Sequence, residues 1–470
     1  MAATSSKTPI WLDCDAYALL LCAHDPRVEL LGVSTVHGNA ALDQTTYNTR
    51  AILEAIGRRD VKVYSGASKP IVRSAVHAAD IHGESGLDGV TLLPQPVEPT
   101  ATDVGHLEAM YRALIAMPPN TAWLVSTGTL TNIGLLFQKY PDLAGHIKGL
   151  SIMGGAVGGS FTDAPMGTVK GEGERFGNWT PYAEFNCDPE ASHFIFSHPV
   201  LKPKTVLIPL DLTHQVLGTK KVRQTLLYGD EVWDPSFNKT DYTPSALRAL
   251  FTQIMSFFAG TYAEVFSITE GPPLHDPLAV AAAYNPDIFD DNGGERFQVG
   301  IVTEGIHSID QTQVGELGRT KVTKLPNGEG GCRIPRHVDL DQFWGSIESS
   351  MKCAVAVSPM PKVSIQDLEK AGVFNGVEKL QFRHRRDLDM TEKYPIEEPG
   401  LTTNCTPTLI ATYCQRRAFA DIFWLKCAQS KYAKLGGPMV KGFRSPGFLV
   451  FFAGQEIGTS AAINGLLSAC

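Results

Sequence analysis

Short apolar runs alternate with helical patterns through the first two hundred residues, and this alternation limits the fold more than any other feature. Six runs are short and apolar enough to be buried strands: Ile10–Leu12, Val28–Val36, Val61–Tyr64, Ala122–Val125, Leu150–Met153 and Val206–Ile208. Helical patterns lie between several of them, at Ala16–Ala23, Leu42–Ile56, Asp103–Ala116, Asn132–Gln138 and Asp188–Ile195. Strands that alternate with helices favour an α/β fold with an open, mostly parallel, doubly wound (Rossmann-like) sheet.

Polar and glycine-bearing segments follow these strands rather than precede them. Asp13 and Asp15 follow the first strand, and Asn39 follows the second; Ser126–Thr129 and Gly154-Gly155 follow two later strands. Ligands of open α/β sheets bind outside the carboxyl ends of the strands. The sequence therefore predicts one pocket where these four segments converge.

Composition and the position of proline residues indicate the class of protein and its domain boundary. The 470 residues carry a net charge of −8, which gives no nucleic-acid footprint. The nine cysteines lack paired spacing, and the apolar run near Phe448–Phe452 is too short to span a bilayer, so a cytoplasmic protein without membrane contact is expected. The Pro-containing segment Ser358–Pro361 predicts a division into residues 9–354 and a C-terminal extension, 355–470, with a helical pattern at Thr412–Leu435 and no assigned function.

Two groups of acidic and amide residues carry possible chemistry. Asp13-Cys14-Asp15 places two carboxylates at a strand end, where they suit a hard cation, although a helix N-cap beside a solvated acid is the alternative. Glu184 and Asn186 flank Phe185, so an extended segment would present both on one face. Such a face suits vicinal hydroxyls, and a polar sheet edge is the alternative.

A third group is His275-Asp276-Pro277, which opens an apolar helix. Asp276 before Pro277 fits an N-cap with proline at the first helical position. His275 is then either a proton donor or an ordinary surface or buried histidine.

These segments, taken in order, resemble the inosine–uridine-preferring nucleoside hydrolase family. Pro9–Asp15 and Leu30–Asn39 are similar to the family's opening. Further matches follow in the family's order: Thr127–Asn132, Met153–Gly155, Asn178, Ala183–Asn186, Asp188–Ala191, His275–Pro277, Gly318–Thr320 and Phe343-Trp344. Each motif alone is weak, but the ordered set spans residues 9–354.

The resemblance implies hydrolysis of the N-glycosidic bond of ribonucleosides around one calcium ion. Carried over by position, Asp15 would be a calcium ligand and general base, with Thr127 giving a carbonyl and Asp276 a further carboxylate. His275 would be the acid for the leaving base. The remaining substrate-binding residues implied are Asn39, Met153, Asn178, Glu184 and Asn186, together with Asp276. A dimer or tetramer is also implied.

The sequence departs from the family at two functional loops. The family's opening runs Asp-x-Asp-Pro-Gly-x-Asp-Asp-Ala, whereas here Ala16 follows Asp15 at once, so five residues with two aspartates are missing. A calcium site needs about six to eight oxygens, several of them charged, so we expect calcium binding and activity to be greatly reduced or absent. The second departure follows Asn186. Family members have a longer connection from this asparagine to the next helix, whereas here only Cys187 lies between Asn186 and the helix start at Asp188.

Two functional hypotheses follow. One is a ribonucleoside hydrolase of nucleoside salvage, acting on purine or pyrimidine nucleosides, with uridine-type substrates favoured. The other is a catalytically inactive homologue that acts in binding or assembly. A phosphate-binding NTPase and a dinucleotide oxidoreductase are disfavoured, because neither G-x-x-x-x-G-K-[ST] nor a G-x-G-x-x-G after the first strand occurs. Candidates for stacking on the base lie between Leu217 and Pro273, with core or surface aromatics as the alternative: Trp233, Phe237, Tyr262 and Phe266.

Overall fold

A computed structural model describes residues 7–13, 16–77, 82–83, 85–169, 173–174, 184–237, 242–307, 313–364, 368, 442–445 and 448–451. By its internal contacts the chain divides into two compact units, Met1–His384 and Arg385–Cys470. The division predicted at residue 355 stays a prediction, and helix α13 continues across it to Val357. Within the second unit the structure describes a two-stranded antiparallel pair, β15 (Gly442–Ser445) and β16 (Phe448–Phe451). The helical pattern at Thr412–Leu435 lies outside the described residues.

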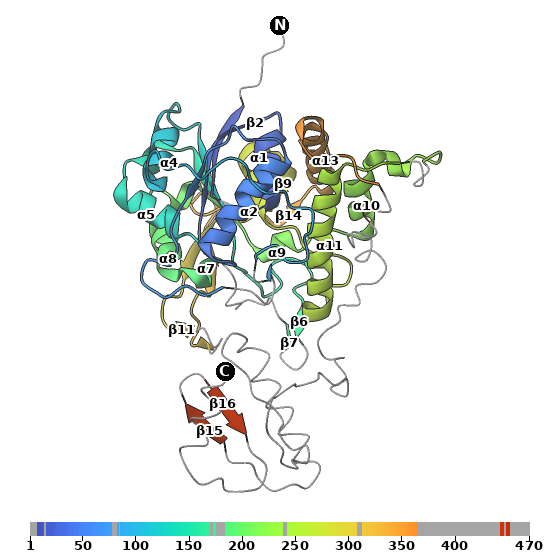
Figure 1. Cartoon of the computed structure of the whole chain (residues 1–470). Coiled ribbons are helices and arrows are strands. Elements are labelled where there is room, and N and C mark those ends of the chain that lie inside the picture. Colours follow the sequence, from blue (N-terminus) through green and yellow to red (C-terminus); the bar gives the residue numbers. More distant parts are fainter. Residues whose placement is uncertain are drawn as a thin grey trace, which may run out of the picture. The chain divides into compact units, whose positions relative to one another are not determined.

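The first unit is built on a six-stranded parallel sheet in the order β3-β2-β1-β4-β5-β8 (Figure 1). Its strands are β1 (Thr8–Asp13), β2 (Val28–Thr35), β3 (Val63–Ser65), β4 (Trp123–Ser126), β5 (Gly149–Met153) and β8 (Thr205–Ile208). All six predicted strands are present. The prediction of an open, parallel α/β sheet is confirmed, and the order, which reverses direction beside β1, is that of a doubly wound fold.

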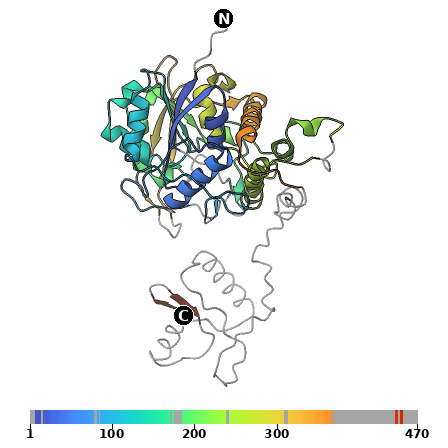
Figure 2. The same cartoon turned by 45° about the horizontal axis from the view of Figure 1, so that its top comes forward.

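Helices cover both faces of this sheet (Figures 1 and 2). β1 shows the division, because Ile10 and Leu12 belong to one apolar cluster and Trp11 to the other. The first cluster takes residues from α1 (Ala16–His24), α2 (Leu42–Ala55), α11 (Ala246–Phe266), α12 (Asp276–Tyr284) and α13 (Leu340–Val357). The second takes them from α4 (His106–Ile115), α5 (Thr131–Lys139), α6 (Leu143–His146) and α8 (Pro189–Ser197).

Smaller elements complete the described chain. The short helices are α7 (Glu184–Cys187), α9 (Leu210–Thr213) and α10 (Lys220–Tyr228), with 3-10 turns η1 (Lys202–Lys204), η2 (Asp230–Trp233) and η4 (Pro286–Ile288). The minor antiparallel pairs are β6 (Thr168–Val169) with β7 (Gly173–Glu174), β9 (Phe289–Asp290) with β14 (His337–Val338), β10 (Phe297–Ile301) with β13 (Thr320–Lys324), and β11 (Ile306–His307) with β12 (Gln313–Val314). Among the described residues, no helix is both long and apolar enough to cross a membrane.

Candidate active site

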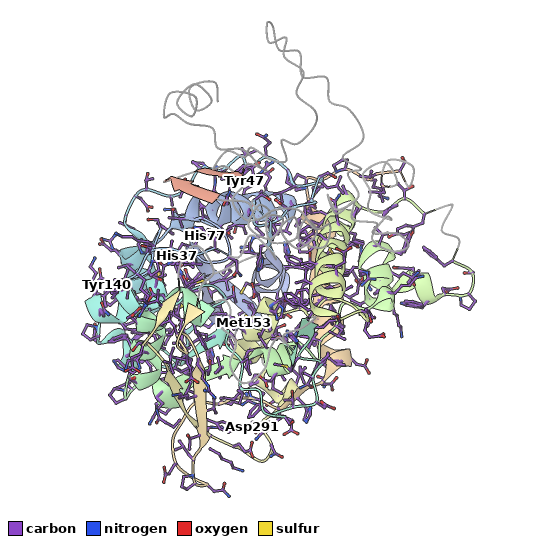
Figure 3. All side chains as sticks on the ribbon, turned by 90° about the horizontal axis from the view of Figure 1, so that it is seen from below. His37, Tyr47, His77, Tyr140, Met153 and Asp291 are labelled. Carbon is purple, nitrogen blue, oxygen red and sulfur yellow. The ribbon has the colours of Figure 1, made fainter. Side chains whose placement is uncertain are left out.

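The predicted pocket segments do meet at one edge of the sheet. β2, β1, β4 and β5 are consecutive neighbours, so the residues that follow them, from His37 to Gly155, lie at adjoining carboxyl ends. Figure 3 views the molecule from this side, with His37, His77 and Met153 labelled. Thr127 is tied directly to the end of β1, because its backbone N–H donates to the carbonyl of Asp13 at 2.8 Å.

Asp13, the last residue of β1, is a buried carboxyl group. Its Oδ1 accepts hydrogen bonds from Ser34 Oγ at 2.6 Å and from Asn132 Nδ2 at 2.8 Å. No hydrogen-bond partner for Oδ2 is found among the described residues. Burial raises the pKa of Asp13 to about 7, because the charged form loses its hydration, and the two hydrogen bonds only partly offset this effect.

Asn132, which sequence reasoning did not single out, connects three segments at this edge. Its side-chain amide donates to Asp13 and to the carbonyl of Thr35 at 3.0 Å, and its Oδ1 accepts from the backbone N–H of Ala67 at 2.9 Å. The side chain is fully buried. Asn132 therefore holds the ends of β1 and β2 and the loop after β3 in register.

His37 lies beside the predicted ribose-binding residue Asn39, which is half-buried. The hydroxyl of Thr131 donates to the carboxylate of Asp188 at 2.6 Å, so it accepts from Nε2–H of His37 at 3.0 Å. Burial lowers the pKa of His37 to about 4, with a smaller contribution from His77. His37 is therefore neutral at pH 7, with its proton on Nε2.

His275 and Asp276 are brought to the same end of the sheet by α12. The prediction that Asp276 caps this helix is wrong by one residue, since α12 begins at Asp276 and His275 occupies the N-cap position without a side-chain capping bond. Pro277 in the first turn fits either boundary, because proline has no N–H to leave unpaired there.

The imidazole of His275 is held at both nitrogens. Nδ1 lies 2.7 Å from Thr213 Oγ1, and Nε2 lies 2.9 Å from the hydroxyl of Tyr262. The rings of His214 and Tyr262 have their centroids 5.5 and 6.0 Å from that of His275. Burial lowers the pKa of His275 well below its usual value, and the nearby His214 and His82 lower it further. The neutral ring is therefore the dominant form at pH 7.

Thr213, His214 and Tyr262 form a polar cluster around His275 that the sequence analysis missed. Thr213 and His214 follow β8 and could have been found by the same rule of polar residues after strand ends. Tyr262 lies on α11 among several other aromatic residues. No local signal distinguishes it.

Glu184 and Asn186 were expected on one face of an extended segment, and this expectation is wrong. Glu184–Cys187 forms the short helix α7 and not an extended segment. The ring of Phe185 packs edge-on against that of Phe196, with the two ring centroids 5.3 Å apart. Asp188 caps α8, because its side chain accepts a hydrogen bond from the N–H of Ala191, and α8 therefore begins directly after α7. Nothing is described for the side chains of Glu184 and Asn186, and Asp15 and Asn178 lie outside the described residues.

The described residues do not form a calcium site. No group of three or more His, Cys, Asp or Glu side chains suited to a metal occurs among them. Two residues alone, Cys14 and Asp15, separate the end of β1 from the start of α1, which leaves no room for the longer acidic loop. The carbonyl of Thr127 and the carboxylate of Asp276 fall short of the oxygen count that calcium requires.

Comparisons with known proteins agree with the family resemblance found in the sequence. A family model described as inosine-uridine preferring nucleoside hydrolase matches residues 10–345. The uridine nucleosidase of Saccharomyces cerevisiae is 35% identical over 76% of this chain and 99% of its own length. A pyrimidine-specific ribonucleoside hydrolase of Shewanella woodyi is 33% identical over 66% of this chain and 89% of its own.

Solved structures agree on the fold. A purine-preferring ribonucleoside hydrolase from Gardnerella vaginalis superposes with a TM-score of 0.58 at 23% identity, covering 74% of this chain and all of that one. A plant nucleoside hydrolase gives a TM-score of 0.54 at 21% identity, covering 73% of this chain and 98% of its own.

Proposed function

This chain belongs to the inosine-uridine preferring nucleoside hydrolase family, and we propose that it is a uridine-type ribonucleoside hydrolase whose activity is severely reduced. The observation that carries the proposal is a contrast between the two sides of the site. The side with His275 is assembled from α9, α11 and α12, whereas the connection after β1 is two residues long. Pyrimidine preference rests on the names of the two relatives described above.

The side with His275 suits departure of the base. Hydrolysis breaks the bond between ribose C1′ and a ring nitrogen of the base, whose electron pair leaves with the base and takes up a proton. His275 can relay that proton. As the hydroxyl that accepts its N–H gives its own proton to the base, it takes up the ring proton, and the other ring nitrogen takes a proton from the second hydroxyl, which recovers one from water. The ring is neutral before and after the transfer. Its neutrality also adds no positive charge beside a sugar that itself becomes positive.

The side that would activate water is impaired. Water adds to C1′ and loses its proton to a base, and the resemblance gives that role to Asp15. With no calcium site among the described residues, nothing there lowers the pKa of water, whose bulk value near 16 makes it a poor nucleophile at neutral pH. A rate far below that of ordinary enzymes follows.

A second candidate function is a catalytically inactive homologue that binds nucleosides or assembles with other chains. The lack of a metal-binding group among the described residues favours it. A cytoplasmic location and a homodimer or homotetramer belong to the proposal in either case, whereas a role in nucleoside salvage belongs to the hydrolase alone.

Chromatographic measurement of uracil and ribose released from uridine tests the proposal. The expected result is stoichiometric release with a kcat well below the range of about 1–1000 s⁻¹ usual for enzymes. His275→Ala should abolish this slow release, whereas His193→Ala, at an exposed site on α8, should not change it. An ordinary kcat would contradict the impairment. No release together with no calorimetric binding of uridine would contradict the hydrolase.

A further inference from the structure

A buried carboxylate holds the loop after β5 against α9. Asp211, the second residue of α9, is only 1% exposed. Its Oδ2 accepts the backbone N–H of Val157 and its Oδ1 that of Gly158, each at 2.7 Å. Successive N–H groups that converge on one anion form a compact binding site for it, and hydrogen bonds to a carboxylate are roughly twice as strong as those between neutral groups.

Backbone contacts strengthen the attachment between α9 and this loop. The N–H of Leu210 donates to the carbonyl of Gly155 at 2.9 Å, and Thr162 Oγ1 donates to the carbonyl of Asp211 at 2.6 Å. The loop begins directly after Met153, a predicted substrate-binding residue at the carboxyl end of β5. α9 and the loop after β5 are therefore fixed to one another.

The same short helix also holds His275. Thr213 lies two residues after Asp211 on α9, is fully buried, and places its Oγ1 2.7 Å from Nδ1 of His275. His275 itself comes from the start of α12, far along the chain. Any shift of α9 therefore moves a hydrogen-bond partner of the His275 ring.

We propose that Asp211 is a positioning residue for departure of the base, an inference that rests on the proposed hydrolase function. Its carboxylate fixes α9 against the loop after β5, so that Thr213 keeps the His275 ring in one place and in one neutral tautomer before the proton transfer. A carboxamide at this position accepts only one of the two N–H groups, because its own NH₂ faces the other. A displacement of about 1 Å at a catalytic group can cost roughly a hundredfold in rate.

Two ribosides with different leaving groups test this role in the full chain. Uracil needs a proton to leave ribose, whereas para-nitrophenolate leaves as a stable anion without one. Asp211→Asn should slow uracil release from uridine roughly tenfold or more and slow nitrophenolate release from para-nitrophenyl riboside less than about threefold. His275→Ala should show the same contrast more strongly. Equal slowing of both substrates by Asp211→Asn, or no slowing of uracil release, would overturn the proposal.

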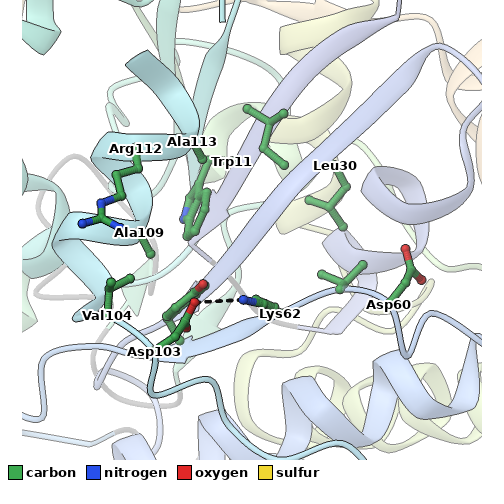
Figure 4. Close-up of a pocket in the computed structure, with 12 residues that line it drawn as sticks. Trp11, Leu30, Asp60, Lys62, Asp103, Val104, Ala109, Arg112 and Ala113 are labelled. Atoms are coloured by element: carbon green, nitrogen blue, oxygen red, sulfur yellow. Dashed lines mark hydrogen bonds and ion pairs between the residues drawn. The ribbon is translucent and has the colours of Figure 1, made fainter. Parts of the chain in front are cut away.

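Two aspartates at the amino ends of the strands provide matched controls. Asp25, just before β2, is buried and accepts from Arg27 Nη2 at 2.7 Å. Asp103 is half-exposed and accepts from Lys62 Nζ, just before β3, at 2.9 Å, which Figure 4 shows as a dashed line. Asp25→Asn and Asp103→Asn each remove a charge that is already paired, so neither should change the ratio of the two rates.

The tautomer of His275 gives a readout that does not depend on activity. Nuclear magnetic resonance spectra with isotopically labelled histidine, assigned by the signals lost in His275→Ala, should show one neutral tautomer in the wild type and a mixture in Asp211→Asn. If the wild type hydrolyses neither riboside, the proposed hydrolase function fails, and this spectrum still decides whether Asp211 positions the ring. An unchanged single tautomer in Asp211→Asn would overturn the positioning role.

A second variant keeps the test decisive if Asp211→Asn does not fold. Asp211→Ser removes the carboxylate without placing an NH₂ group against the loop, and it should give the same contrast between the two ribosides and the same mixture of tautomers. Failure of both variants to fold would show that Asp211 serves stability alone, which contradicts the proposal.

Discussion

The buried ring of His214 gives the clearest quantitative prediction, because one cause dominates its titration. Its Nδ1 lies 2.7 Å from the carbonyl of Pro165, a group that only accepts, so Nδ1 holds the proton of the neutral ring. Burial lowers the pKa of His214 from 6.5 to about 4, and the hydrogen bond to Pro165 opposes this shift only in part. The rings that face it belong to His275, also with a lowered pKa, and to Tyr262.

The sign and size follow from proton binding. Between pH 4 and 6.5 the unfolded chain holds a proton on this histidine and the folded chain does not, so the free energy of unfolding falls as the pH drops below 6.5. A pKa near 4 in the folded state corresponds to a loss of about 2.5 kcal/mol between pH 7.5 and pH 4.5. Above pH 6.5 this contribution is fully retained.

The assay is urea unfolding of the wild type and His214→Asn at pH 7.5 and pH 4.5. Asparagine keeps an N–H donor for Pro165 but does not titrate, and the cost of the smaller side chain is the same at both pH values. The wild type should therefore lose about 2.5 kcal/mol more than the variant on acidification. His193→Asn, at an exposed position, should show the wild-type loss. Equal losses for wild type and His214→Asn would refute the reasoning.

Three further outcomes are expected. Glu348→Gln should lower the free energy of unfolding by about 3 kcal/mol in urea titrations, because it breaks the buried ion pair in which Arg248 Nη2 donates to Glu348 Oε1 at 2.6 Å. The double variant Arg248→Met with Glu348→Leu should recover most of this loss, since it leaves no unpaired buried charge. Gly155→Ala should cost about 2 kcal/mol or more, since a Cβ would lie 2.6 Å from Phe185 at a φ of +68°, whereas Gly159→Ala, with open space at +60°, should cost about 1 kcal/mol. The thermal midpoint should not differ between millimolar calcium and millimolar EDTA, since a ligand stabilises only the state that binds it.

The sheet could be predicted from sequence because its strands are buried on both faces and so form continuous apolar runs. Ile10–Leu12 illustrates this, with residues that alternate between the two apolar clusters. The convergence of the strand ends then followed from the general rule for parallel sheets.

What could not be predicted depends on long-range packing or on short connections. Tyr262 meets His275 from a neighbouring helix, and Asn132 links segments far apart in the sequence, so no local pattern reveals either contact. Glu184–Cys187 was expected to be extended because its residues alternate in polarity. The segment is helical because Phe185 is buried and Asp188 caps the following helix. The polarity pattern of the four residues themselves reveals neither of these interactions.

Restoring the missing loop tests most directly whether the short β1–α1 connection limits activity. Pro-Gly-Leu-Asp-Asp is inserted between Asp15 and Ala16, and Pro-Gly-Leu-Asn-Asn serves as a control of equal length without the two carboxylates. Calcium binding by calorimetry and uracil release from uridine are measured for both and for the wild type. The acidic insertion should bind calcium and raise kcat roughly a hundredfold or more, and the amide insertion should do neither. Tight calcium binding with an ordinary kcat in the unmodified chain, or equal recovery with both insertions, would contradict this account.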